Sequence, residues 1–318
     1  MRSTRLGVDG PEVGAIGLGC MGMTWAYDPN GRDDAASVEV LRTALDLGVT
    51  LIDTADVYGP YDNEELVGKG LAGAYRERAV LATKVGLVPG RDGARVGNDG
   101  RPEHVRRSID ESLRRLGTDH VDLYQLHRVD PEVPVEETWG AMAEAVAAGK
   151  ARLLGLSEVT VEQIERARAV HPVASVQSEL SLWTRDALAE VLPYTEANGI
   201  AFLPYSPLGR GFLAGRFGSA ADLPADDWRS TLPRFQADAL AANQALVGTV
   251  RVIADRHGAT PAQVALAWVV AQGQYVVPTP GTKTPKYLAD NAGAADLVLS
   301  ADELAELDAL PAPVGGRY

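Results

Sequence analysis

Three apolar runs of the sequence contain, near their ends, side chains that can hold or move a proton. Asp53 lies in LIDT, Lys84 in LATK and His127 in YQLH, and Tyr58 follows five residues after Asp53. A tyrosine has a pKa of about 10, and a neighbouring ammonium lowers it. A carboxylate can hold that ammonium, and a histidine can orient a carbonyl group. These four residue types predict a site that protonates a carbonyl oxygen.

Each of the four residues also has an ordinary structural explanation. Asp53 can cap a turn, Lys84 can be solvated, His127 can be satisfied in the core and Tyr58 can pack in a loop. Six successive predicted strands end in polar groups, however, which capping alone does not explain. We therefore expect one shared site. The further polar strand ends are Ser157, Gln177, Ser178, Tyr205 and Ser206.

Short apolar runs alternate with longer amphipathic segments along the whole chain. The runs predict strands at 13–18, 48–54, 79–84, 121–127, 152–157, 173–178, 199–206 and 275–279. The segments predict helices at 35–47, 63–72, 102–116, 135–148, 161–170, 186–197, 238–256, 261–271, 285–292 and 301–310. Such alternation is typical of a parallel sheet with crossover helices.

Eight strand–helix units in one chain predict a closed α/β barrel, the (β/α)8 or TIM barrel. No linker divides the chain, so we expect a single domain over residues 1–318, with extra helices and a long loop after the seventh strand. A doubly wound open sheet is the alternative. In a barrel, the carboxyl ends of all strands meet at one rim, which would bring the polar strand ends together.

The composition excludes several classes of function. The 318 residues include 43 acids and 30 bases, for a net charge of −13, which argues against nucleic acid or an anionic membrane as a partner. One cysteine excludes an internal disulfide, and the five histidines show no metal-site spacing. No apolar run reaches the length of a membrane span or a signal peptide, so we expect a cytoplasmic protein.

A glycine motif near the N-terminus matches the dinucleotide fingerprint G-x-G-x-x-G. It runs from Gly17 to Gly22 as GLGCMG. A true fingerprint must open a helix whose N-terminus faces the pyrophosphate. The residues that follow include DPNG, which is typical of a turn. We therefore interpret the motif as a bend that leaves the first strand.

The motifs LIDTADVYG, LATK and YQLHR, in this order, resemble those of the aldo-keto reductases. The resemblance continues through GLSE, VQSELSLW, PYSPLGRGFL and PTPGTK, and so covers nearly the whole chain. It implies a (β/α)8 barrel that binds NADPH without a Rossmann domain. By position, it implies that Tyr58 is the general acid, that Lys84 tunes it, that Asp53 holds the lysine and that His127 orients the carbonyl.

The resemblance also implies how the cofactor binds. Tyr205 would stack on the nicotinamide, and Ser157 and Gln177 would bind its carboxamide. Glu158 stands where many relatives have asparagine. A loop after the seventh strand, with Arg210, would wrap the pyrophosphate, and two lysines at a helix start would favour the 2′-phosphate of NADPH. The other expected cofactor contacts are Cys20, Met21, Ser206, Pro207, Leu208, Gly209, Gly211, Gly281, Thr282, Lys283, Lys286, Asp290 and Asn291.

Cys20 is expected to be a small packed residue, because nothing near it in the sequence activates a thiolate. Trp25 and Trp183 are candidates for the substrate pocket, and the tail 311–318 is expected to be mobile.

Three functions are compatible with these residues. The first is NADPH-dependent reduction of an aldehyde or ketone, with a small carbonyl compound as partner. The second is an NADPH-binding regulatory or sensor protein of the same fold. The third is a Schiff-base lyase that uses Lys84 as nucleophile.

Overall fold

Seven parallel strands form the central sheet. The computed structural model describes residues 1–27, 31–89, 96–223 and 227–318. The sheet order follows the chain, with each strand beside its predecessor. The strands are β3 (Leu18–Gly19), β4 (Leu51–Asp53), β5 (Val80–Val85), β8 (Val121–Leu126), β9 (Ala151–Ser157), β10 (Ser175–Glu179) and β11 (Ala201–Tyr205).

The segment 275–281 closes this sheet into a barrel. On one side, the Val277 amide donates to the Phe202 carbonyl of β11 at 2.9 Å. On the other side, the Gly17 amide donates to the Pro278 carbonyl at 2.9 Å. The eighth strand is irregular because Pro278, and a second proline two positions later, have no amide hydrogen to donate to a ladder. The predicted (β/α)8 barrel is confirmed, and the open sheet is excluded.

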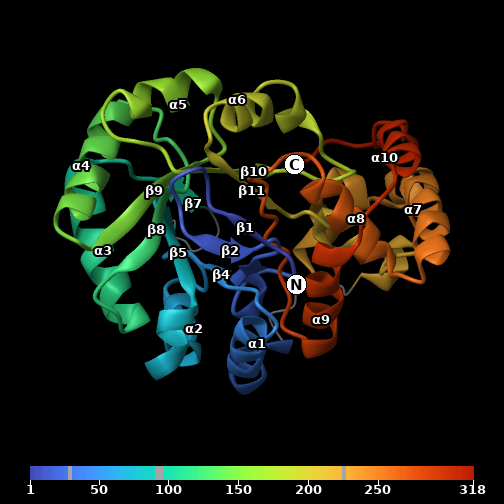
Figure 1. Cartoon of the computed structure of the whole chain (residues 1–318), viewed down its shortest axis with the longest axis horizontal. Coiled ribbons are helices and arrows are strands. Elements are labelled where there is room, and N and C mark those ends of the chain that lie inside the picture. Colours follow the sequence, from blue (N-terminus) through green and yellow to red (C-terminus); the bar gives the residue numbers. More distant parts are fainter. Residues whose placement is uncertain (28–30, 90–95, 224–226) are drawn as a thin grey trace.

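Helices surround the barrel, as Figure 1 shows. In the described part of the chain, six helices follow the strands around the outside of the barrel, and four more lie along the last third of the sequence. Short 3₁₀ segments connect several of them. The helices are α1 (Asp34–Asp46), α2 (Asp62–Gly70), α3 (Pro102–Leu116), α4 (Val135–Ala147), α5 (Val161–Arg168), α6 (Val191–Ala197), α7 (Ala237–His257), α8 (Pro261–Val270), α9 (Pro285–Gly293) and α10 (Ala301–Asp308). The turns are Met21–Met23, Gly73–Arg78, Asp186–Leu188, Gly209–Gly211, Ala220–Asp222, Trp228–Thr231, Pro233–Phe235 and Ala294–Asp296.

Local sequence signals set the ends of these helices. Helix α3 begins at Pro102, whose fixed φ suits a first turn, and it ends at Gly117, which has φ 66°. In α5, Thr160 and Gln163 form a reciprocal capping box. The expected helix 186–197 is broken instead. A helix that began at Asp186 would place Pro193 in its interior, whereas α6 places this proline in its first turn.

The first predicted strand is divided between two elements. Strands β1 (Ser3–Arg5) and β2 (Glu12–Gly14) form an antiparallel hairpin, and only β3 enters the barrel. Leu6 and Val13 of the hairpin pack with the barrel residues Leu51, Leu123 and Leu203. The hairpin therefore covers the amino-terminal end of the barrel, at the centre of the view in Figure 1.

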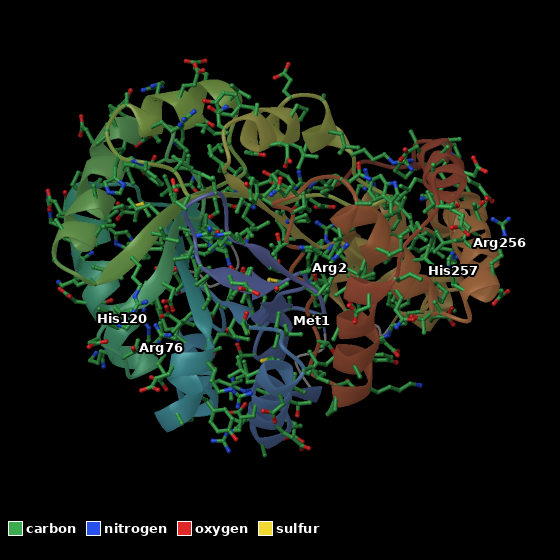
Figure 2. All side chains as sticks on the ribbon, viewed as in Figure 1. Met1, Arg2, Arg76, His120, Arg256 and His257 are labelled. Carbon is green, nitrogen blue, oxygen red and sulfur yellow. The ribbon has the colours of Figure 1, made fainter. Side chains whose placement is uncertain are left out.

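A hydrogen bond and an ion pair hold the N-terminal residues and helix α10 against the rest of the protein. The Arg2 amide donates to Asp296 at 2.9 Å, and Figure 2 shows Met1 and Arg2 over the middle of the molecule. At the right of Figure 2, Arg256 and His257 end α7. Arg256 pairs with Glu306 of α10 at 2.9 Å. Helix α10 is thereby attached to α7.

A second hairpin follows β5 and was not expected from the sequence. It consists of β6 (Leu87–Pro89) and β7 (Val96–Asn98), which pair antiparallel. The glycine motif at 17–22 leads into the single 3₁₀ turn Met21–Met23 and not into a long helix, as predicted. Of the turn DPNG, residues 28–30 lie outside the described part of the chain. None of the helices in the described part is long and apolar enough to cross a membrane.

Candidate active site

A buried lysine lies at the centre of the site. Lys84, at the end of β5, is fully buried. Its Nζ donates to Asp53 Oδ2 at 2.6 Å, to the Thr54 carbonyl at 2.9 Å and to the Tyr58 hydroxyl at 3.3 Å. An ammonium has three hydrogens, and each of these is directed at one acceptor. The structure thus brings three of the four predicted residues into direct contact.

Two glutamines hold the carboxylate that faces this lysine. Gln125 Nε2 and Gln177 Nε2 donate to Asp53 Oδ1 at 3.0 and 3.1 Å. Gln177 was expected to bind a carboxamide, and in this structure its amide nitrogen orients Asp53. Sequence reasoning missed Gln125. Gln125 lies in β8, two residues before His127, which directly follows the strand. This spacing of two, which places side chains on one face of an extended chain, was the available signal.

His127 lies beside the tyrosine as a neutral ring. The His127 and Tyr58 rings meet edge to face, with centroids 5.7 Å apart. Burial, and then the positive charges of Lys84 and Arg128, hold the pKa of His127 well below its usual value. Nδ1 of His127 is buried, and it neither accepts nor donates a hydrogen bond within the described part of the protein. The imidazole is therefore uncharged at neutral pH.

The expected lowering of the tyrosine pKa is not what the structure gives. Burial raises the pKa of Tyr58 above its ordinary value, and the nearby Lys84 offsets this only in part. Burial alone would lower the pKa of Lys84, but Asp53 and Tyr58 raise it overall. The site therefore holds a protonated phenol beside a permanent cation. That cation stabilises the phenolate once the proton has left.

The two tryptophans proposed for the substrate pocket have different surroundings. The Trp25 ring lies 5.9 Å from the Tyr58 ring and packs in the same cluster as Met21 and Leu87. Trp183 is only 1% exposed and stacks on Phe212 at 4.3 Å. Trp183, expected at the substrate pocket, is thus part of the hydrophobic core in this structure.

Cys20 is also enclosed by the core. It has no exposed surface, and burial raises the pKa of its thiol. Cys20 is therefore a small packed residue, as expected, and it exposes no surface to which a cofactor could bind in this structure. Met21 is half-buried beside Tyr58.

The polar groups at the ends of β9 and β11 are already engaged with protein partners. Arg128 Nη1 donates to Ser157 Oγ at 3.1 Å. Glu158, with φ 53°, accepts from the Glu179 amide at 3.0 Å and from Arg317 at 2.9 Å. Tyr205 accepts a hydrogen bond from Arg317 at its hydroxyl. Glu158 therefore does not replace the asparagine of relatives as a carboxamide ligand in this conformation.

The loop after β11 folds as tight turns. Ser206, Gly209 and Gly211 have positive φ, and Pro207 is buried and Leu208 half-buried. A Cβ on Gly209 would lie 2.5 Å from the Trp183 ring, so core packing as well as φ requires glycine there.

Arg210 of this loop was expected to face an anion. Its guanidinium is buried and pairs with Glu179 at 3.2 Å instead.

The start of α9 offers groups that suit a phosphate. Unlike α5, α8 and α10, it has no capping side chain, because Thr284 makes no such bond. Its first amides therefore keep their partial positive charge for an anion. Lys286 is exposed in this turn, and Lys283 Nζ donates to the Gly31 carbonyl at 2.6 Å. The neighbouring expected contacts are exposed Gly281, half-buried Thr282 and Asp290, and buried Asn291.

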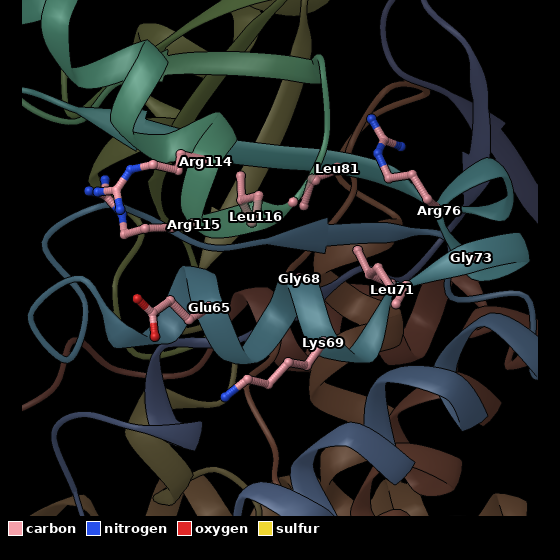
Figure 3. A pocket seen from close by; sticks show the side chains of 12 residues that line it. Glu65, Gly68, Lys69, Leu71, Gly73, Arg76, Leu81, Arg114, Arg115 and Leu116 are labelled. Atoms are coloured by element: carbon pink, nitrogen blue, oxygen red, sulfur yellow. The ribbon is translucent and has the colours of Figure 1, made fainter.

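A hollow of about 490 Å³ lies outside the barrel between α2 and α3. Figure 3 shows Lys69, Arg114 and Arg115 around it, with Glu65. No residue of the site at the rim lines it. Among the described residues, no group of histidine, cysteine and carboxylate side chains could hold a metal ion.

Comparison with known proteins decides the family. The sequence model of the Aldo/keto reductase family matches residues 15–312. This chain belongs to the aldo-keto reductase family. A probable aldo-keto reductase 1 of Glycine max is 44% identical over 322 residues, which span all of this chain and 92% of that relative.

Solved aldo-keto reductases share the fold. The glycerol dehydrogenase of Gluconobacter oxydans is 32% identical with a TM-score of 0.86, over 96% of this chain and 94% of its own. A thermostable aldo-keto reductase in complex with the inhibitor epalrestat is also 32% identical, with a TM-score of 0.78. The match covers 97% of this chain and 99% of that reductase. An aldo/keto reductase from Klebsiella pneumoniae in complex with NADP and acetate is 30% identical, with a TM-score of 0.75. The match covers 100% of this chain and 99% of the Klebsiella chain. The present aldo-keto reductase is thus an NADP-dependent oxidoreductase that acts on carbonyl groups.

Proposed function

We propose that this protein reduces an aldehyde or ketone to an alcohol with NADPH, and that Tyr58 is the general acid. The observation that carries the proposal is the contact of 3.3 Å between Lys84 Nζ and the Tyr58 hydroxyl, with Asp53 on the far side of the ammonium at 2.6 Å. This arrangement stabilises the phenolate that forms when the phenol gives its proton to a carbonyl oxygen.

Each side chain of the group has a defined part in the proposal. Tyr58 keeps its proton at neutral pH because burial raises its pKa, and it releases the proton only as negative charge develops on the substrate oxygen. Lys84 stays charged and Asp53 fixes its position. His127 is neutral, so it orients the carbonyl by a hydrogen bond and adds no charge. NADPH supplies the hydride to the carbonyl carbon.

The chain's residues fit a nicotinamide dinucleotide phosphate. Tyr205 at the end of β11 would provide the stacking ring, and Ser157 would provide a hydroxyl for the carboxamide. At the other end, the uncapped start of α9 with Lys283 and Lys286 suits the 2′-phosphate. The NADP complex of the Klebsiella relative supports the same cofactor.

The contacts of Lys84 do not support the lyase hypothesis. A Schiff-base nucleophile must be a neutral amine that can reach the substrate. Lys84 is fully buried, and Asp53 and Tyr58 raise its pKa. The ammonium therefore stabilises charge and does not attack a carbonyl.

The proposal is tested with the purified protein and a panel of aldehydes and ketones. We expect NADPH oxidation with part of the panel, and slower oxidation of NADH because it lacks the 2′-phosphate. Tight NADPH binding with no turnover over the whole panel would contradict the proposal and would favour a regulatory or sensor protein.

A further inference from the structure

The last residues of the chain return to the rim of the barrel. The Val314 amide donates to Asn243 Oδ1 of α7 at 2.8 Å, and Asn243 Nδ2 donates to the Val314 carbonyl at 3.0 Å. Arg234 Nε donates to the Gly315 carbonyl at 3.2 Å. Figure 1 marks the C-terminal end close to β10 and β11. The tail was expected to be mobile, and in this structure it is docked.

Arg317 of this tail joins side chains from the ends of three strands. Its Nε donates to Oε2 of Glu179, the last residue of β10, at 2.7 Å. Its Nη2 donates to Glu158 Oε2, after β9, at 2.9 Å and also to the Tyr205 hydroxyl of β11. The Arg317 guanidinium also lies 5.0 Å from the ring of Tyr318. One guanidinium therefore bridges the acidic pair and the tyrosine.

The charges in this cluster balance. Glu158 and Glu179 carry two negative charges, and Arg210 and Arg317 carry two positive ones in direct contact. The side chain of Glu179 is only 1% exposed, so water screens its charge weakly. Without Arg317, one carboxylate next to Tyr205 would have no compensating partner.

We propose that Arg317 is a positioning residue that neutralises the acidic pair beside Tyr205 and so sets the preference of the site between the two redox forms of the cofactor. The inference depends on the proposed function, in which Tyr205 stacks on the nicotinamide. The oxidised ring is a cation and the reduced ring is neutral. An uncompensated carboxylate would therefore strengthen binding of NADP⁺ relative to NADPH. With Arg317 in place, this bias toward the oxidised form is removed.

The experiment measures dissociation constants for NADPH and NADP⁺ by calorimetry in wild type and variants. In Arg317→Met we expect the ratio of the NADPH constant to the NADP⁺ constant to rise about tenfold, the order expected for one added charge in a poorly screened site. Arg317→Lys retains the charge and is expected to keep the ratio within about twofold of wild type.

Two further variants make the test independent of this one side chain. Glu158→Gln leaves a positive excess, so the ratio should move in the opposite direction. Arg106→Met is the matched control, because Arg106 forms a half-exposed pair with Glu144 at 2.7 Å between α3 and α4. This control should leave both constants unchanged.

Three results would overturn the inference while leaving the proposed function intact. The first is an unchanged ratio of the two constants in Arg317→Met and Glu158→Gln. The second is an equal loss of affinity for NADPH and NADP⁺ in Arg317→Met, which a merely structural role would give. The third is a lysine variant that behaves like the methionine variant. Wild-type protein that binds neither nucleotide would instead overturn the proposed function, and this inference with it.

Discussion

Replacing Lys84 with methionine separates the structural from the chemical part of the site. The change keeps an unbranched side chain that is one atom shorter, and it removes the charge. Asp53, only 4% exposed, then keeps the two glutamine amides but loses its cation. Breaking a buried ion pair by removing one partner costs about 3–5 kcal/mol of unfolding free energy. We expect a loss of about 3 kcal/mol, because the two amide donors remain.

The double variant Asp53→Asn with Lys84→Met provides the decisive comparison. The asparagine oxygen still accepts from both glutamine amides, and no uncompensated charge remains. We expect it to recover about 2 kcal/mol of the loss in equilibrium urea unfolding. Turnover should stay at least about a hundredfold below wild type in both variants, because neither has a cation to stabilise the Tyr58 phenolate. A double variant no more stable than Lys84→Met, or one that regains turnover, would refute the reasoning.

Three more predictions concern residues other than Asp53, Tyr58, Lys84 and His127. Burial, and then the charge of Glu64, raises the pKa of Asp56 well above 3.8, so the folded protein holds a proton that the unfolded chain releases. The stabilisation that comes from this bound proton is lost as the pH rises above 3.8. In thermal unfolding, the stability of Asp56→Asn relative to wild type should therefore increase from pH 5 to pH 8. An equal difference at the two pH values would contradict this prediction. Trp183→Ala should cost about 3–5 kcal/mol in urea unfolding, as for a core ring. Trp25→Ala should mainly raise KM for the carbonyl substrate. Because Trp25 is less buried than Trp183, a similar loss of unfolding free energy in Trp25→Ala and Trp183→Ala would contradict these two predictions.

Local sequence signals were sufficient to predict most of the strands and helices of the barrel. Alternation of apolar and amphipathic segments gave the parallel order, and Pro102 and Gly117 gave both ends of α3. The signals failed where an element depends on distant partners. The eighth strand lacks a regular ladder because of its prolines, and the β1–β2 hairpin is stabilised by packing on the barrel interior.

The side chains that meet around Lys84 could be predicted from the sequence in part, whereas their electrostatics could not. Polar strand ends identified Asp53, Lys84 and His127 because a barrel brings those ends together. Burial cannot be read from the sequence, so the raised pKa of Tyr58 was missed. The contacts of Arg317 were missed as well, because they join segments more than a hundred positions apart in the chain.

The central claim is that the Tyr58 phenol gives the proton in carbonyl reduction. Tyr58→Phe removes one oxygen and keeps the ring against Trp25 and His127. The account predicts that NADPH affinity stays close to wild type while single-turnover oxidation of bound NADPH by a carbonyl substrate slows by at least about a hundredfold. Oxidation at the wild-type rate by this variant would contradict the account.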